Sequence, residues 1–332
     1  MKASSDYTTP DSTAPDSVES PLPDSTGSLD TPAESHRSGF AAILGRPNAG
    51  KSTLLNAILG VKLAIVASKP QTTRTSIQGV LTLSNAQIVF VDTPGIHRSD
   101  TLLNKRMMDS VRTVADGPDV VLFVVDALAP FSARDAEAVD LVKKAATPAI
   151  AVINKVDWLE DKTKVLSIIE RYRAMYDFST YVPVSALRRQ GLDVLLKEIV
   201  KYLPEGPALY PADYLTDQPE RFLAAELVRE KILHVTQQEV PHAIAVMIES
   251  WEDTEKLLRI AATIYVERPG QKAILIGAGG SVLKKIGTAA RLELEHILGR
   301  KVFLETFVKV RPHWRDDPHF LSAIDWRMGH EA

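Results

Sequence analysis

The sequence predicts an α/β domain with a mostly parallel sheet, followed by a smaller α+β domain. Between residues 38 and 202, short apolar runs rich in β-branched residues alternate with stretches of helical periodicity. This alternation is typical of a parallel sheet with helices on both faces. Prolines at positions 204, 207, 211 and 219 interrupt the pattern and predict a linker over residues 203–217. Residues 218–332 then form the second domain.

Composition and charge limit the possible classes of protein. The chain has 332 residues, of which 45% are hydrophobic, and a formal net charge of −3. Because it has no cysteine, disulfides and thiolate metal sites are excluded, which suits a reducing cytosol. No apolar run approaches the roughly 18 residues that a membrane span requires. Residues 1–37 are acidic and rich in Ser, Thr and Pro, so we expect a disordered tail without a signal or transit peptide.

One segment of the first domain has the pattern G-x-x-x-x-G-K-S, which is typical of a phosphate-binding P-loop. It follows the apolar run 40–44, which we expect to be a strand, and precedes the helical stretch 53–59. The glycines let backbone N–H groups face an anion at the N-terminus of that helix. Lys51 would reach the β- and γ-phosphates, and Ser52 would hold Mg²⁺. The nucleotide-binding residues predicted here are Gly45, Arg46, Pro47, Asn48, Ala49, Gly50, Lys51, Ser52 and Thr53.

Three later segments indicate that the nucleotide is GTP. The strand 88–91 ends in Asp92, Thr93, Pro94 and Gly95; Asp92 suits a Mg²⁺ contact and the Gly95 N–H suits the γ-phosphate. A strand at 149–153 leads into N-K-V-D, where the Asp157 carboxylate can accept from guanine N1–H and N2–H₂, which adenine lacks. The other base-binding residues predicted, the last two of which would bring an N–H near guanine O6, are Asn154, Lys155, Ser185 and Ala186.

These motifs resemble those of the TRAFAC-class GTPases, and specifically the Era family. The resemblance is carried by G-R-P-N-A-G-K-S-T-L-L-N, by Q-T-T-R at 71–74, by D-T-P-G-I-H and by N-K-V-D. It implies that Thr73, rather than Thr72, is the switch I threonine that completes the Mg²⁺ shell with Ser52 and Asp92. Switch I would span about residues 68–75. The residues expected to act in hydrolysis are Lys51, Thr73 and Gly95.

Two positions sharpen the expected mechanism. Ile96 stands where Ras-type GTPases place a glutamine that orients water, so hydrolysis should be slow or rely on another group. Asn48 stands where related GTPases bind a monovalent cation, which raises the hypothesis of K⁺-stimulated hydrolysis. The alternative is that Asn48 only shapes the loop.

The second domain has the order helix, strand, strand, helix, helix, strand, with G-A-G-G at 277–280 between the helices. We expect a helix at 221–233, antiparallel strands at 242–251 and 257–266, helical stretches from 281 to 287 and from 289 to 298, and a strand at 302–310. The order and the loop resemble the type II KH domain of Era, which clamps about four unpaired nucleotides. Residues 268–311 have nine basic and three acidic side chains, a net charge of +6. The RNA-binding residues predicted are Gly277, Ala278, Gly279, Gly280, Lys284 and Lys285.

Some features of this domain leave alternatives open. KH loops usually have a basic residue between the outer glycines, whereas this chain has Ala278 and Gly279, so a phosphate contact is missing. The G-A-G-G segment could be a plain turn, and the two lysines could be an ordinary solvated face. Trp314 could stack on a base or pack in the core.

The family resemblance implies binding and hydrolysis of GTP, with Mg²⁺ as the expected cofactor; K⁺ is the further hypothesis raised by Asn48. It further implies binding near the 3′ end of small-subunit ribosomal RNA during small-subunit assembly, by a cytoplasmic monomer. In some bacteria such proteins also associate peripherally with the inner membrane, although this sequence shows no anchor. Two rivals are an RNA-binding scaffold that holds GTP with negligible hydrolysis, and a P-loop ATPase or kinase.

Overall fold

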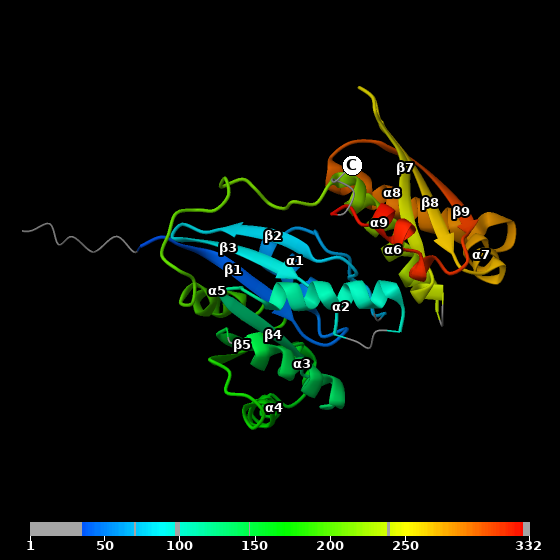
Figure 1. The fold of residues 1–332 in the computed structure, drawn as a ribbon. Coiled ribbons are helices and arrows are strands. Elements are labelled where there is room, and N and C mark those ends of the chain that lie inside the picture. The colour runs from blue at the N-terminus through cyan, green and yellow to red at the C-terminus, as the bar shows by residue number, and fades with distance from the viewer. Residues whose placement is uncertain (1–34, 70, 97–99, 146, 238–239, 328–332) are drawn as a thin grey trace, which may run out of the picture. The chain divides into compact units, whose positions relative to one another are not determined.

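The first domain is built on one six-stranded sheet, in the order β2-β3-β1-β4-β5-β6, as seen in the computed structural model (Figure 1). The structure describes residues 35–69, 71–96, 100–145, 147–237 and 240–327, so most of the predicted acidic tail lies outside the described residues. Only β2 runs antiparallel to its neighbour, which confirms the expected parallel α/β fold. The strands are β1 Arg37–Leu44, β2 Ile77–Thr82, β3 Ala86–Asp92, β4 Val120–Asp126, β5 Ala149–Asn154 and β6 Thr180–Pro183.

Helices cover both faces of this sheet. On one face α1 and α5 pack against alternate strand residues such as Ile43, Phe90 and Leu122. On the other face α2, α3 and α4 pack against the residues between them, such as Leu44 and Phe123. Because successive strand residues point to opposite faces, the continuous apolar runs fill both cores. The helices are α1 Lys51–Leu59, α2 Leu102–Ala115, α3 Ala133–Ala145, α4 Lys164–Arg173 and α5 Leu192–Val200.

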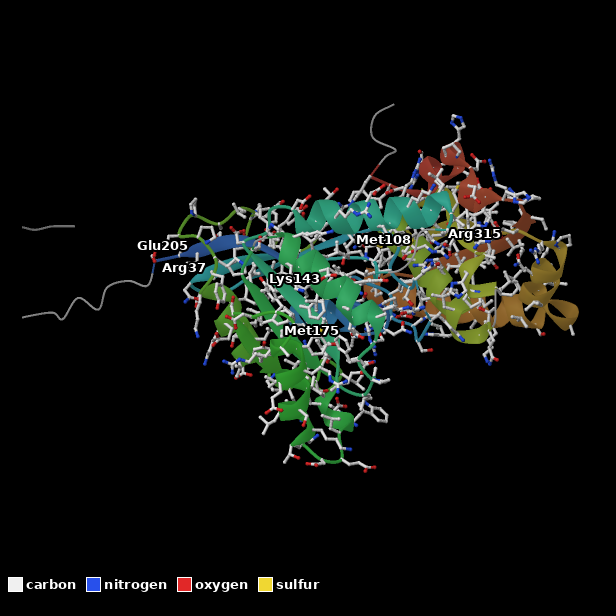
Figure 2. All side chains as sticks on the ribbon, turned by 60° about the horizontal axis from the view of Figure 1, so that its bottom comes forward. Arg37, Met108, Lys143, Met175, Glu205 and Arg315 are labelled. Atoms are coloured by element: carbon white, nitrogen blue, oxygen red, sulfur yellow. The ribbon has the colours of Figure 1, made fainter. Side chains whose placement is uncertain are left out.

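The proline-containing segment after α5 follows the outer strands of the sheet. The Gln87 side chain accepts hydrogen bonds from the N–H groups of Leu209 and Tyr210, at 2.7 and 2.8 Å. Val80 N–H donates to Leu215 O at 2.8 Å. At the start of β1, Arg37 pairs with Glu205 at 3.0 Å (Figure 2). Strand β1 thus begins one residue before the boundary predicted at residue 38.

The second domain packs its helices on a three-stranded sheet in the order β7-β8-β9. Strands β7 and β8 are antiparallel, as predicted, and β8 and β9 are parallel. The order along the chain, helix, strand, strand, helix, helix, strand, is also the predicted one. Residues 35–332 form one compact unit. The elements are α6 Glu220–Val235, β7 Ala245–Asp253, β8 Leu258–Val266, α7 Pro269–Ile276, α8 Ser281–Leu298, β9 Val302–Val310 and α9 Pro318–Ile324.

One helix prediction for this domain was wrong. The stretches 281–287 and 289–298 form one continuous helix, α8. Glycine at 287 weakens a helix by only about 1 kcal/mol. The apolar face on both sides of it is continuous, because Ile286, Ala290 and Leu294 are all buried in the core. Packing of this face outweighs the local preference.

Within the described residues, no single helix is long and apolar enough to span a bilayer. The pair Pro269–Ile276 and Ala278–Leu298 passes that test only when taken together, and it is bent by 46°.

Candidate functional site

The predicted P-loop connects β1 to α1 and is shaped by two glycines. Gly45 and Gly50 have φ angles of 147° and 96°, a region that favours glycine. A Cβ atom at Gly50 would lie 2.3 Å from Asn154 Nδ2, so the loop also needs glycine for this close approach. Lys51 Nζ donates to the carbonyls of Gly45 and Arg46, each at 3.3 Å. Burial lowers the pKa of Lys51, and Asp92 partly opposes that shift.

Three oxygen ligands meet beside the P-loop. Ser52 Oγ lies 2.7 Å from Thr73 Oγ1 and donates to Asp92 Oδ2 at 2.6 Å. Asp92 is fully buried, and among the described residues its Oδ1 has no hydrogen-bond partner. Burial raises the pKa of Asp92 to about 6, against the opposing effect of Lys51. A buried carboxylate oxygen without a partner is unfavourable unless a cation or donor satisfies it.

This set of residues fits Mg²⁺. Neighbouring ligands of octahedral Mg²⁺, each about 2.0–2.1 Å from the ion, are roughly 2.9 Å apart, close to the separation of the two hydroxyls. Among the described residues, no group of three His, Cys, Asp or Glu side chains is arranged to hold a metal. Phosphate oxygens are therefore needed to complete the shell, as is usual for Mg²⁺ in nucleotide sites. Thr72 instead donates its hydroxyl to Lys69 O at 2.6 Å, so Thr73 is the threonine beside Ser52 and Asp92.

The segment after β3 lies against the P-loop. A Cβ atom at Gly95 would come within 2.7 Å of the Pro47 backbone, so the close contact requires glycine. Thr93 donates its hydroxyl to Ile43 O at 2.8 Å and fixes the segment to β1. The Ile96 side chain is only 4% exposed and packs in the core with α2 and α3. It therefore cannot hold a water molecule at the phosphates. Residues 97–99 of the predicted switch loop lie outside the described residues.

A cavity of about 380 Å³ lies next to the P-loop and is lined by the predicted base-binding residues except Ser185. Asn154 is buried and links three segments: it donates to Ala49 O at 3.0 Å and accepts from the N–H groups of Lys155 and Ala186. Asp157 Oδ1 is buried and has no hydrogen-bond partner within the described part of the chain. The lining residues are Gly50, Thr53, Leu128, Asn154, Lys155, Asp157, Trp158, Ala186 and Leu187.

A second, smaller cavity of about 50 Å³ is lined by the P-loop, by switch I and by Gly95. Gly50 and Thr53 line both cavities, so the two meet at the start of α1. Of the predicted phosphate and metal ligands, Ser52, Thr73 and Gly95 line the smaller cavity, whereas Lys51 and Asp92 are not part of its lining. The larger cavity is lined by all the predicted base ligands except Ser185. A carboxylate aimed into the larger cavity suits a base with adjacent N–H donors.

The Ser185–Ala186 segment makes hydrogen bonds that hold its own loop in place. The Ala186 N–H donates to Asn154 Oδ1 at 3.0 Å. Ser185 Oγ accepts from the Arg188 N–H at 3.0 Å and closes the turn. Both residues therefore brace the loop, and Ala186 also lines the larger cavity.

Sequence reasoning missed three residues around this cavity. Asp126, the last residue of β4, pairs with Lys155 Nζ at 2.7 Å. Leu128 and Trp158 line the cavity, and the Trp158 side chain is 63% exposed. Asp126 could have been found, because it ends a parallel strand at the edge where ligands bind. The two apolar residues gave no pattern of their own.

The G-A-G-G segment joins α7 to α8 through a short 3-10 helix, Ala278–Gly280. Its three glycines have φ angles of 70°, 56° and 79°. A Cβ atom at Gly277 would lie 2.5 Å from the Val282 side chain, whereas nothing lies near the corresponding positions of Gly279 and Gly280. The segment is thus an open loop before the N-terminus of an 18-residue helix, with Ala278 exposed at its tip.

The nine basic residues of the segment 268–311 divide into two groups. Five form ion pairs with nearby carboxylates: Arg291, Arg300, Lys301, Lys309 and Arg311. For the other four no ion pair is found within the described part of the chain, and they lie on α7, at its N-cap, or on α8: Arg268, Lys272, Lys284 and Lys285. The uncompensated positive charge is therefore concentrated around the G-A-G-G loop, which suits a phosphate backbone.

Trp314 does not offer a ring for stacking on a base. It is fully buried, donates from Nε1 to Ala243 O at 3.0 Å, and packs in a cluster with residues of α2 and α9. The packing alternative is the correct one. The segment 310–315, which contains Trp314, therefore belongs to the packed contact with α2 and α9.

Comparisons with known proteins follow the same division into two domains. Residues 40–155 match the 50S ribosome-binding GTPase family, and residues 239–315 match the KH domain family. GTPase Era of Ruminiclostridium cellulolyticum is 45% identical over 294 residues, which covers 88% of this chain and 98% of the relative. GTPase Era of Geobacter metallireducens is 49% identical, over 87% of this chain and 98% of the relative.

Two crystal structures resemble the whole of the described fold. One is an Aquifex aeolicus Era variant bound to GDP and AlF4−, with a TM-score of 0.84 and 42% identity. The other is Era in complex with MgGDPNP and nucleotides 1506–1542 of 16S ribosomal RNA, with a TM-score of 0.85 and 43% identity. Each covers 87% of this chain and 98% of the solved one. With its GTPase and KH domains in the same order, this chain belongs to the Era family of GTPases.

Proposed function

We propose that this chain binds and hydrolyses GTP with Mg²⁺, and that it binds the 3′ end of small-subunit ribosomal RNA during assembly of the small ribosomal subunit. The nucleotide half of the proposal rests on two buried carboxylate oxygens that have no hydrogen-bond partner among the described residues, Asp92 Oδ1 and Asp157 Oδ1. Asp92 lies beside Ser52 and Thr73, and Asp157 lines the larger cavity. One Mg²⁺-bound guanine nucleotide would satisfy both.

Selection of guanine rests on the larger cavity. Asp157 would accept from guanine N1–H and N2–H₂, two neighbouring donors that suit a carboxylate. Adenine would leave the carboxylate unpaired, which is the kind of loss that gives strong discrimination. The Lys155 stem lines the same cavity, while its Nζ is held by Asp126 and by Asn48 O. This arrangement disfavours the ATPase or kinase alternative.

Hydrolysis would proceed by attack of water on the γ-phosphorus. Lys51 and the P-loop N–H groups would bind the β- and γ-phosphate oxygens and stabilise the charge that develops there. Ser52, Thr73 and Asp92 would hold Mg²⁺, which neutralises phosphate charge when bound. Gly95 N–H would contact the γ-phosphate. No described side chain at this site is an evident general base, so turnover should be slow.

Turnover measurements test this half of the proposal. Wild-type protein should release phosphate from GTP over many turnovers, and Lys51→Ala or Asp92→Ala should reduce the rate by at least about 100-fold. Binding of GTP without turnover in the wild type would favour the scaffold that uses GTP only as a structural ligand.

The cofactor proposal includes K⁺. Asn48 Nδ2 donates to Ser68 O at 3.0 Å, so this side chain links the P-loop to switch I. Among the described residues its side-chain oxygen has no hydrogen-bond partner, which leaves it available to a monovalent cation near the phosphates. Turnover should be faster in K⁺ than in Na⁺ at equal ionic strength. Equal rates would exclude this role.

The RNA half of the proposal rests on the G-A-G-G loop and the four basic residues around it without ion pairs. Exposed glycines let a sugar–phosphate backbone approach the N-terminus of α8. The Era complex with 16S ribosomal RNA supports the same ligand for this chain. Because Ala278 and Gly279 provide no charge, we assign the phosphate contacts to Lys284 and Lys285. We further infer a cytoplasmic monomer with peripheral inner-membrane contact, which light scattering and vesicle flotation would test.

A further inference from the structure

Helix α6 of the KH domain binds switch I and also the segment of the GTPase domain that leads into it. Arg229 donates through its two terminal nitrogens to Thr72 O and to Gln71 O, the latter at 3.4 Å. Glu230 accepts from Val66 N–H at 2.8 Å and from Lys62 Nζ at 2.6 Å. Ile65, in the segment before switch I, is buried in the core of the KH domain.

The carbonyls that Arg229 binds precede the metal-site threonine directly. Thr73 follows Thr72, and its hydroxyl lies 2.7 Å from Ser52 Oγ and 3.5 Å from Asp92 Oδ2. A single peptide unit therefore separates the contact made by the KH domain from the side chain at the proposed Mg²⁺ site. Displacement of this backbone would move Thr73 away from Ser52 and Asp92.

The backbone at this point is strained. Gln71 has a φ angle of 61°, in the left-handed region that disfavours residues with a side chain. Such a conformation persists only where the surroundings hold it in place. Its surroundings are Arg229, which binds the Gln71 carbonyl, and Asn104 of α2, which accepts from the Gln71 side chain at 3.0 Å.

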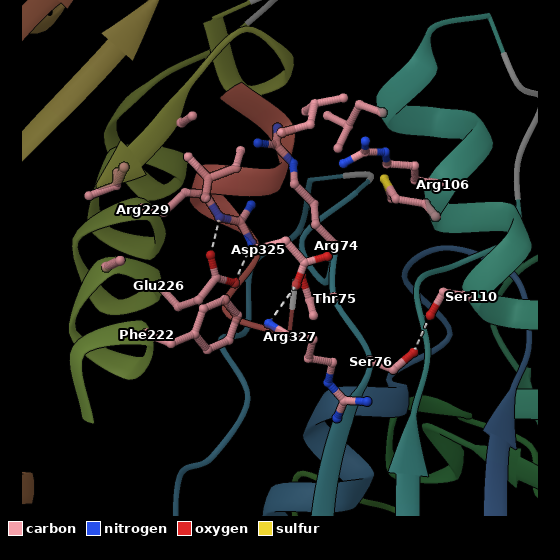
Figure 3. Close-up of a pocket in the computed structure, with 17 residues that line it drawn as sticks. Arg74, Thr75, Ser76, Arg106, Ser110, Phe222, Glu226, Arg229, Asp325 and Arg327 are labelled. Carbon is pink, nitrogen blue, oxygen red and sulfur yellow. Dashed lines mark hydrogen bonds and ion pairs between the residues drawn. The ribbon is translucent and has the colours of Figure 1, made fainter. Parts of the chain in front are cut away.

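Arg229 is itself fixed in place. It is only 2% exposed and forms a two-pronged pair with Glu226, with contacts of 2.7 and 2.6 Å. Figure 3 shows this pair on α6, facing Arg74 and Thr75 across a cavity of about 120 Å³ whose other wall is α2. Arg74 reaches in the opposite direction and donates to Ile244 O of the KH domain at 2.6 Å. The planar guanidinium of Arg229 thus presents two donors in a set geometry.

We propose that Arg229 is a positioning residue for GTP hydrolysis, because it holds the switch I backbone so that Thr73 stays at the Mg²⁺ site. This inference rests on the proposed Mg²⁺–GTP function. It also identifies the contact, between Arg229 and switch I, through which a change in the KH domain would affect the nucleotide site. Arg229 touches neither the nucleotide nor the metal in this scheme and acts only through Thr73.

Mg²⁺ titrations of nucleotide binding test the proposal in the full-length protein. The probe is a fluorescent non-hydrolysable GTP analogue, with GDP affinity as the second readout. Arg229→Met should raise the Mg²⁺ concentration for half-maximal analogue binding about tenfold, because it removes charge-assisted hydrogen bonds to switch I. GDP affinity should change less than about twofold, since switch I contacts the γ-phosphate side of the site. Arg221→Met, an exposed position on the same helix, is the matched control.

A second variant distinguishes loss of the switch I contact from loss of folding. Arg229→Met leaves Glu226 without its partner, so Glu226→Leu with Arg229→Met removes both charges and should show the same tenfold shift. In a Thr73→Ala background, Arg229→Met should add no further shift, because the two act in one pathway.

Three results would overturn the proposal. One is the same Mg²⁺ dependence for the Arg229 variants and the Arg221 control, and another is an equal loss of GDP affinity, which would indicate general damage. The third is a full additional shift in the Thr73→Ala background. If instead the proposed Mg²⁺–GTP function were wrong, the wild-type protein itself would bind the analogue without any dependence on Mg²⁺.

Discussion

At the residue scale, the site is defined by polar atoms that the protein leaves without partners. Lys51, Ser52 and Asn154 have internal hydrogen bonds, whereas Asp92 and Asp157 each keep one buried oxygen without one. Native proteins satisfy nearly all buried polar atoms. Of the six buried side-chain atoms without a partner among the described residues, these two are the ones beside the predicted nucleotide site, so we expect the nucleotide and Mg²⁺ to supply their partners there.

The guanine assignment makes the sharpest prediction at this scale. Asp157→Asn replaces a carboxylate that accepts two hydrogen bonds with an amide, so GTP affinity should fall by at least about 100-fold while XTP affinity rises. Competition between GTP and XTP for a fluorescent nucleotide measures the switch. Asp161→Asn, on the loop after the cavity, should leave both affinities unchanged. An unaltered preference in Asp157→Asn would remove this residue from base recognition.

Sequence motifs identify the candidate ligand residues, because ligand binding fixes their type and spacing, and the structure brings Ser52, Thr73 and Asp92 together. The sequence could not predict which hydrogen bonds these residues exchange with one another. The Ala186 N–H, for example, donates to Asn154, a partner 32 positions earlier in the chain, which no sequence pattern indicates. Arg229 carried no motif at all, and only the packing of α6 on switch I places it near the site.

At the element scale, the predicted strands and their order are confirmed, since long apolar runs in this chain are core strands. Helix α8 shows where local signals mislead: Gly287 suggested a break, but a buried face at 286, 290 and 294 continues through it. Helix α9 was not predicted. Asp317 at its N-cap, followed by Pro318, was the signal, because this pair is typical of a helix start.

Two glycines on either side of the start of α8 should respond oppositely to the same change. Gly287 is helical and a Cβ atom there would lie 3.6 Å from Thr306 Oγ1, an ordinary contact, so Gly287→Ala should stabilise the protein by about 0.5–1 kcal/mol. Gly277 has a φ of 70° and no room for a Cβ atom, so Gly277→Ala should destabilise it. Urea unfolding measures both. Destabilisation by Gly287→Ala would mean that the glycine serves close packing on β9.

At the scale of the whole molecule, the two domains share an electrostatic network as well as the Arg229 contact. Glu230, 1% exposed, binds Lys62 of the GTPase domain and Lys231 of its own helix. Glu293 of α8 joins the same two lysines. The network ties α6 and α8 to the segment before switch I, so the docking of the domains and the state of the nucleotide site depend on common residues.

This network predicts a defined pH dependence. Burial alone would raise the pKa of Glu230, but hydrogen bonds from Lys231, Lys62 and the Val66 N–H outweigh burial and lower it. A carboxylate whose folded pKa is lowered adds stability above its unfolded pKa and loses it as the pH falls through the folded value. Glu230→Gln should therefore cost about 3 kcal/mol of unfolding free energy at pH 7.

The difference between the wild type and Glu230→Gln should shrink below about pH 4.5, where Glu230 gains a proton in the unfolded chain. Urea unfolding at pH 7 and at pH 4 measures it. Glu198→Gln, which removes a pair with the exposed Lys201, should cost less than about 0.5 kcal/mol at either pH. A pH-independent cost for Glu230→Gln would mean that its charge has no part in the docking.

We infer that this chain couples the binding of a guanine nucleotide to the binding of RNA. By linkage, if GTP favours RNA binding, RNA favours GTP by the same factor. The most direct test is fluorescence anisotropy with an oligonucleotide of the small-subunit RNA 3′ end and a scrambled control, with a GTP analogue and with GDP. We expect the protein to bind the RNA oligonucleotide specifically. This binding should strengthen with the GTP analogue and be lost in the Gly277→Asp, Gly280→Asp double variant. Equal binding in both nucleotide states, or none above the scrambled control, would contradict it.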